Sequence, residues 1–128
     1  MTSVIFLLTF LSYGCSANND EFTKIKFDLT FKNMELIPDS INIKENSELN
    51  LNITSDIDGK LHIHGYNIEG EISKNKISNI TIKLNATGNF PIAFHPKSND
   101  DEHDGHHHKT EKTTHEETLV GNLIVNPE

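Results

Sequence analysis

The sequence concentrates histidine, a side chain that often binds transition metals, in two places. The first is a pair of histidines two residues apart, His62 and His64. The second is the polar stretch 96–117, which follows His95 and whose histidines lie among aspartate and glutamate: His103, His106, His107, His108 and His115. Neutral imidazole suits both Cu(II) and Zn(II). The histidines therefore predict a metal-binding protein whose ion is copper or zinc.

The spacing of His62 and His64 is that of a β-strand. Leu61 and Ile63 alternate with the two histidines, and side chains two residues apart on a strand project from the same face. Two imidazoles on one face can hold a single metal ion between them. In the alternative interpretation, His62 and His64 are surface residues that only make hydrogen bonds.

The histidines of 96–117 indicate a different kind of site. Clusters of histidine with carboxylates bind Zn(II), Ni(II) or Cu(II) without a fixed geometry. The stretch is also longer than ordinary connections between strands, which favours either function or disorder. We expect it to act as a capture zone for metal ions. The alternative is a solvated loop whose histidines bind nothing.

The elements that must position these side chains are predicted to be β-strands. In 24–32, apolar and polar residues alternate strictly, and this period of two predicts a half-buried strand. No segment has a helical period, and 65–70 is expected to loosen the strand before it. Short strands between turn residues predict an all-β fold, an antiparallel β-sandwich that forms one domain over 23–128. The further strands are expected at 41–43, 49–53, 61–63, 80–84, 90–94 and 119–125.

The composition limits the partners and the chemistry of the protein. The chain has 11 basic residues against 19 acidic ones and a net charge of -8, whereas nucleic acids and anionic membrane surfaces attract positively charged proteins. We therefore expect no nucleic-acid partner, while an acidic domain favours cations. A single cysteine rules out an internal disulfide. The sequence offers no nucleophile with a partnered base, so we expect no enzymatic activity.

The first residues are expected to lie outside the domain. An apolar run, 4–11, precedes Gly14 and Cys15, and this order resembles a bacterial lipoprotein signal, although no lysine or arginine precedes the run. We expect a signal peptide at 1–14, a lipid on Cys15 and a tether at 15–22. The protein is then anchored to a membrane outside the cytoplasm, in the cell envelope or periplasm. The alternatives are ordinary secretion, or an N-terminal strand with a buried cysteine.

Four segments follow one another in an order that is found in one family of β-sandwiches. They are PDSINI at 38–43, DGKLH at 58–62, GNFPI at 88–92 and VGNLIV at 120–125. The order resembles that of the cupredoxins, which are small Greek-key β-sandwiches of secreted or periplasmic proteins. The run HIHGY that begins at His62 also resembles a run in a bacterial cupredoxin-like subgroup of poorly known function. The resemblance implies a Greek-key topology for the whole domain.

The resemblance also says which copper site to look for, since type 1 cupredoxins hold copper with two His, one Cys and a weak axial Met. His62 falls where the first histidine is expected, but Phe94 stands at the cysteine position and Leu119 at the methionine position. No blue copper site is therefore expected. In such a sandwich the start of the His62 strand and the end of the His95 strand lie at one pole. We expect His62, His64 and His95 to converge there.

Two functional hypotheses follow. The first is an extracytoplasmic cupredoxin-like protein that binds copper or zinc through histidines and acts as a carrier, a buffer or a resistance accessory. The second is a metal-free, cupredoxin-derived interaction module that docks to a larger envelope protein. Converging strand histidines favour the first hypothesis. Histidines far apart, beside a large exposed apolar patch, favour the second.

Overall fold

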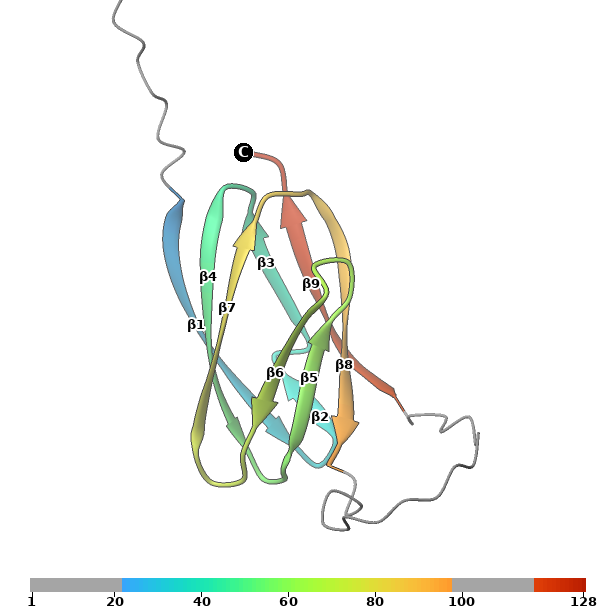
Figure 1. Ribbon diagram of the computed structural model, residues 1–128. Coiled ribbons are helices and arrows are strands. Elements are labelled where there is room, and N and C mark those ends of the chain that lie inside the picture. The colour runs from blue at the N-terminus through green and yellow to red at the C-terminus, as the bar shows by residue number, and fades with distance from the viewer. Residues whose placement is uncertain (1–21, 98–116) are drawn as a thin grey trace, which may run out of the picture.

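The computed structural model describes residues 22–97 and 117–128, which form two β-sheets packed face to face (Figure 1). Strands form where apolar and polar residues alternate, because successive side chains of a strand point to opposite faces of the sheet. The first sheet has four strands in the order β2-β1-β4-β7. Their bounds are Glu35–Ile37 for β2, Thr23–Lys32 for β1, Ser47–Ser55 for β4 and Ile77–Leu84 for β7.

The second sheet carries the strand histidines. It has five strands in the order β3-β9-β8-β5-β6. Their bounds are Ser40–Lys44 for β3, Thr118–Asn126 for β9, Gly88–Pro96 for β8, Gly59–Ile63 for β5 and Ile68–Ile72 for β6. In this sheet β8 lies between β9 and β5 and pairs with both. The HIHGY run begins with His62 near the end of β5.

The prediction of an all-β sandwich is confirmed. The described residues contain no helix, and accordingly none of their elements is a helix able to cross a membrane. Within the described strands five pairs are antiparallel, and two pairs, β1–β4 and β3–β9, are parallel. Parallel neighbours need a long connection. Between β1 and β4 the chain forms β2 and then β3 of the other sheet, and only then returns beside β1.

Two of the strands are not predicted from the sequence. One is β2, which has only three residues. The other is β6: the expectation that 65–70 merely loosens the preceding strand is wrong, since Ile68–Ile72 forms a strand paired with β5. The turn between β5 and β6 is tight because Gly65 and Asn67 adopt positive φ angles of 82° and 53°. Glycine and asparagine tolerate this conformation better than other residues.

The hydrophobic core lies between the two sheets and consists of their inward-facing side chains. Leu49, Leu51 and Ile53 of β4 and Leu61 and Ile63 of β5 belong to this core, and all five are at most 1% exposed. The polar residues that alternate with them lie on the outer faces. Side chains between buried strand positions therefore point to solvent, and this applies to the histidines.

Candidate metal centre

The strand histidines lie on the outer face of the five-stranded sheet. In β5 the residues on either side of His62 face the core, so His62 projects outward, and His64 follows on the same side just past the strand. In β8 the buried Phe94 precedes His95, which projects outward as well. The structure thus places three histidines on one face: His62 on β5, His64 in the turn after it and His95 on the neighbouring β8.

The pairing register places these side chains around Ala93 of β8. His62 lies opposite Ala93 on one side, and Leu119 of β9 lies opposite Ala93 on the other. Ala93 is 0% exposed although its register puts it on the outer face. Its size leaves room for imidazole rings above the sheet.

The imidazole rings are close to one another. The ring centroids of His62 and His64 are 4.4 Å apart, and those of His62 and His95 are 5.9 Å apart. One ligand atom each from His62, His64 and Glu117 lies within 4.8 Å of the other two. Ligand atoms of a tetrahedral site with bonds of about 2.0–2.1 Å are about 3.3 Å apart. The three ligand atoms here therefore lie within about 1.5 Å of the separation that a single ion requires.

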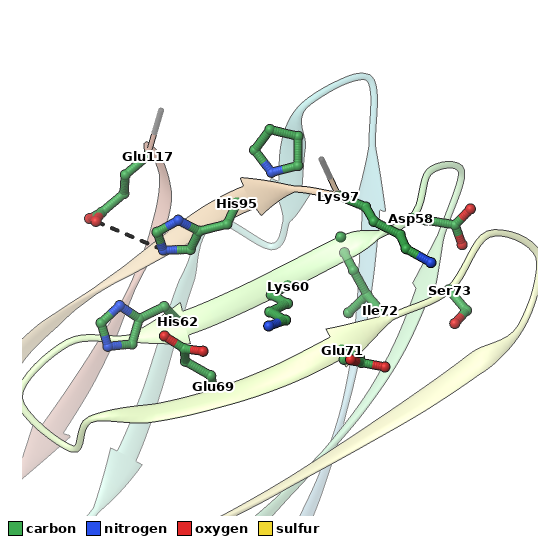
Figure 2. A pocket seen from close by; sticks show the side chains of 12 residues that line it. Asp58, Lys60, His62, Glu69, Glu71, Ile72, Ser73, His95, Lys97 and Glu117 are labelled. Atoms are coloured by element: carbon green, nitrogen blue, oxygen red, sulfur yellow. Dashed lines mark ion pairs between the residues drawn. The ribbon is translucent and has the colours of Figure 1, made fainter. Parts of the chain in front are cut away.

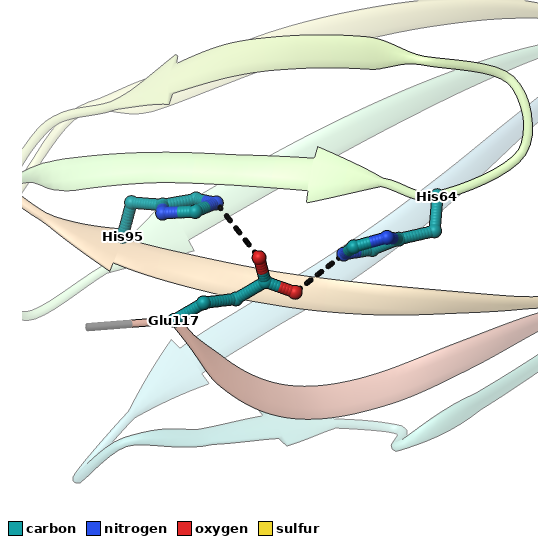
Figure 3. A network of polar contacts seen from close by, with 3 residues as sticks. All are labelled: His64, His95 and Glu117. Carbon is teal, nitrogen blue, oxygen red and sulfur yellow. Dashed lines mark ion pairs between the residues drawn. The ribbon is translucent and has the colours of Figure 1, made fainter. Parts of the chain in front are cut away.

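Glu117 links the histidines from the residue before β9. Because Phe94 pairs with Thr118, Glu117 lies next to His95 across the strand pair. Its Oε1 is 2.5 Å from Nε2 of His64, and its Oε2 is 3.8 Å from Nε2 of His95 (Figure 3). The Glu117 side chain is 34% exposed, so as plain ion pairs these contacts add little stability.

Two imidazole nitrogens of this cluster are buried without a hydrogen-bond partner among the described residues, Nε2 of His64 and Nε2 of His95. The contact between His64 and Glu117 is short, but its direction is not that of a hydrogen bond. A buried nitrogen without a partner costs about 1–3 kcal/mol, and coordination of a metal ion by His64 would remove this cost at that residue. Imidazole nitrogen and carboxylate oxygen are common ligands of Zn(II) and Cu(II). The residues present therefore fit such an ion.

An open cavity of about 660 Å³ adjoins the cluster (Figure 2). His62, His95 and Glu117 form part of its wall, and Figure 2 shows the carboxylate of Glu69, from β6, on the His62 side. Four carboxylates stand against two ammonium groups in the lining, which therefore attracts cations. The charged lining residues are Asp58, Lys60, Glu69, Glu71, Lys97 and Glu117.

Phe94 and Leu119 stand where a type 1 copper site has its cysteine and its methionine, and neither residue carries sulfur. Phe94 is fully buried, and its ring centroid lies 4.7 Å from that of Phe31 in the core. Leu119 is 65% exposed. Within 22–97 and 117–128 the single sulfur atom belongs to Met34, which lines a separate groove. The described residues thus bring neither thiolate nor thioether to the histidines.

The turn after β5 fixes the direction of His64. The backbone N–H of His64 donates a 2.9 Å hydrogen bond to the carbonyl oxygen of Pro91 in β8. In the same turn the ring of Tyr66 packs against Phe90 with centroids 4.6 Å apart, and the Tyr66 hydroxyl donates a 2.7 Å hydrogen bond to the carbonyl oxygen of Ala86. The turn is thus attached to β8 and to the loop before it, and it holds the His64 imidazole over the sheet.

We expect Tyr66→Phe to lower the free energy of unfolding by about 0.5–1.5 kcal/mol at neutral pH, because it removes this hydrogen bond. Burial raises the pKa of the Tyr66 hydroxyl above 10.0, and the nearby charge of Glu45 raises it further, although the hydrogen bond to Ala86 lowers it. A raised pKa in the folded state contributes stability below about pH 10 that is lost as the pH rises. Urea unfolding should therefore show that raising the pH from about 9 to 11 lowers the free energy of unfolding less in Tyr66→Phe than in the parent. Equal losses would contradict this account.

Several residues singled out in the sequence lie outside the described residues. They are Cys15 and the histidines of the polar stretch, His103, His106, His107, His108 and His115. Glu117, in contrast, is described and belongs to the cluster, although the sequence does not distinguish it from the other acids of 96–117. One signal is available: Glu117 lies two residues before Leu119, so a strand continued backward puts both on one face. That this face also holds His95 follows from the strand pairing alone.

No protein-family model and no curated protein sequence matches the chain. Among solved structures, the fold resembles a copper binding protein in the apo form (9% identity, 80% of this chain and 88% of that chain, TM-score 0.55). It also resembles a chain of a heme-copper terminal oxidase dimer (18% identity, 98% and 78% covered, TM-score 0.55). A third neighbour is auracyanin A, a blue copper protein from Chloroflexus aurantiacus (9% identity, 80% and 99% covered, TM-score 0.51). Identities this low show the fold and not the function. The chain has a cupredoxin-like fold, as its order of segments predicts.

Proposed function

We propose that the protein binds a copper or zinc ion through His62, His64 and Glu117, with His95 beside them, and serves as a metal carrier, buffer or resistance accessory. One observation carries the proposal: ligand atoms of two histidines and a carboxylate lie within 4.8 Å of one another. Neutral imidazoles and an ionised carboxylate coordinate the ion. Three protein ligands leave a coordination position open, which suits a protein that takes up an ion and passes it on.

The surroundings of the cluster support this function. His62, His95 and Glu117 line the acidic cavity, and the net charge of -8 draws cations toward the domain. Neighbours of the same fold include a copper binding protein and a blue copper protein, which makes copper the first ion to test. The histidines of 98–116, which lie outside the described residues, would add metal-binding capacity to the chain.

The alternative, a metal-free interaction module, is less well supported. Strand histidines far apart, beside a large exposed apolar patch, would favour it, whereas the rings of His62 and His64 are 4.4 Å apart and those of His62 and His95 are 5.9 Å apart. A location outside the cytoplasm rests on the apolar run 4–11 and on Cys15. Fractionation of cells that express the full chain tests that location, and recovery of the protein in the cytoplasm would reject it.

Calorimetric titration with Cu(II) and Zn(II) tests the proposed function. The five histidines of 98–116 are first replaced by asparagine, so that binding reports the strand site alone. We expect one ion per chain, and a loss of about 10- to 100-fold in affinity for Glu117→Gln, which removes a charged ligand. Glu71→Gln is the matched control: it removes the same charge from the same cavity without touching the cluster. Absent binding, or equal losses in both variants, would reject the site.

A further inference from the structure

Every donor atom that the described residues bring to the cluster is nitrogen or oxygen. The donors are the imidazoles of His62, His64 and His95 and the carboxylate of Glu117. The lining of the adjoining cavity adds carboxylates, ammonium groups and a hydroxyl, but no sulfur. Soft thiolate and thioether ligands select Cu(I), whereas imidazole suits Zn, Cu, Fe and Ni, and carboxylate suits hard divalent ions. The donor set therefore distinguishes two oxidation states of copper.

The sulfur atom of the described residues, that of Met34, lies in a groove that no residue of the cluster lines. Met34 lines a groove of about 550 Å³ together with Ile37 and Leu119, and neither His62 nor His95 borders that groove. Leu119 is the member of this groove nearest the cluster in the sheet, because it lies opposite Ala93, whose other neighbour is His62. At this position the chain presents a branched hydrocarbon and no donor atom.

The charge of the cavity acts in the same direction as the donor set. Four carboxylates face two ammonium groups in its lining. Coulomb attraction is proportional to the charge of the ion, so each carboxylate attracts Cu(II) twice as strongly as Cu(I) at the same distance and dielectric constant. Solvent screening reduces both attractions by a common factor and leaves their ratio unchanged. Soft-ligand preference and charge thus both disfavour the reduced ion.

We propose that this site binds copper as Cu(II) and releases it when the ion is reduced to Cu(I), an inference that rests on the proposed function. In the release step one electron passes from a one-electron reductant of the ascorbate class to the ion. The bonds from the ion to imidazole nitrogen and carboxylate oxygen break, and the ligands keep their lone pairs. The Cu(I) ion then binds to a sulfur-bearing acceptor. The protein is a carrier of oxidised copper that gives up its ion to reducing partners.

The test uses the full chain with the histidines of 98–116 replaced by asparagine, loaded with one equivalent of Cu(II) and freed of unbound copper. Ascorbate is added without oxygen, in the presence of bicinchoninate, which binds Cu(I). Electron paramagnetic resonance follows the loss of bound Cu(II), and absorbance follows the Cu(I)–bicinchoninate complex. We expect an affinity for Cu(I) at least about 100-fold below that for Cu(II). A smaller difference between the two affinities would overturn the inference, whereas a chain that never binds Cu(II) would reject the proposed function instead.

A pair of variants tests whether the missing sulfur sets this preference. Leu119→Met places a thioether two residues from Glu117 on the outer face, and Ile77→Met places one on β7 of the other sheet. The two parent side chains are almost equally exposed, at 65% and 67%. We expect Leu119→Met to retain Cu(I) at least about 10-fold more tightly than the parent, with Cu(II) affinity unchanged, and Ile77→Met to match the parent. Equal Cu(I) retention by the two variants would contradict the role assigned to sulfur.

Discussion

Replacing His62 and His64 together with alanine should lower the affinity for Cu(II) and Zn(II) by more than about 100-fold. Even residues that only support metal ligands contribute about 10- to 100-fold each, and here two of the three clustered ligands are removed. Glu117 and His95 remain, but a carboxylate and one imidazole make a weak site. The measurement is calorimetric titration in the chain without the histidines of 98–116, since those histidines would mask the loss.

The matched control for this double variant is Asn79→Ala/Thr81→Ala. These residues have the same spacing, are exposed, and lie on the outer face of β7 in the opposite sheet. We expect the control to bind both ions as the parent does. Circular dichroism should show the same β-sheet signal for parent, variant and control, because every substitution lies on an outer face. Parental affinity in the His62→Ala/His64→Ala chain would show that the ion is held elsewhere.

The second large effect is on stability: Phe94→Ala should lower the free energy of unfolding by about 3–5 kcal/mol. Phe94 is 0% exposed, and its ring centroid lies 4.7 Å from that of Phe31. Gly59 faces the same ring, and a Cβ at Gly59 would collide with it, so the core is closely packed at this point. Small domains have a total stability of only about 5–15 kcal/mol. Urea unfolding followed by circular dichroism should show a clearly lower midpoint.

Two further variants keep this prediction testable if Phe94→Ala does not fold. Phe94→Leu leaves a smaller cavity and should cost less than the alanine variant. Ile77→Ala removes a large side chain that is 67% exposed, so its effect should stay within about 0.5 kcal/mol. A cost for Phe94→Leu as small as that of Ile77→Ala would contradict the assignment of Phe94 to the core.

The two predictions concern separate properties because the two sets of residues lie on opposite faces of the same strands. Phe94 and His95 are adjacent in β8, yet one packs into the core and the other borders the cluster. Histidine variants should therefore lose metal affinity at nearly constant stability. The proposed site lies over Ala93 on the outside of the sheet. It does not use the two positions that carry sulfur ligands in type 1 cupredoxins.

The sequence by itself determined seven of the nine described strands and the faces of their side chains. The alternation in 24–32 predicts β1, and the alternation around His62 and His64 puts both imidazoles on the face opposite Leu61. These inferences succeed because the period of two is a local property of extended backbone. The order of segments along the chain was also sufficient to predict a cupredoxin-like fold.

The tertiary structure alone decided which strands are neighbours and in what register. The parallel pairs, the strand β6 and the position of Glu117 all depend on pairing between segments distant in sequence. Alternation shows which face of the sheet a side chain occupies. It does not show which residues of other strands lie beside that side chain, because this depends on strand pairing and register. Glu117 joins histidines from two other segments because β9 aligns beside β8 and β8 beside β5. A ligand supplied by such long-range pairing leaves no periodic signal in the chain.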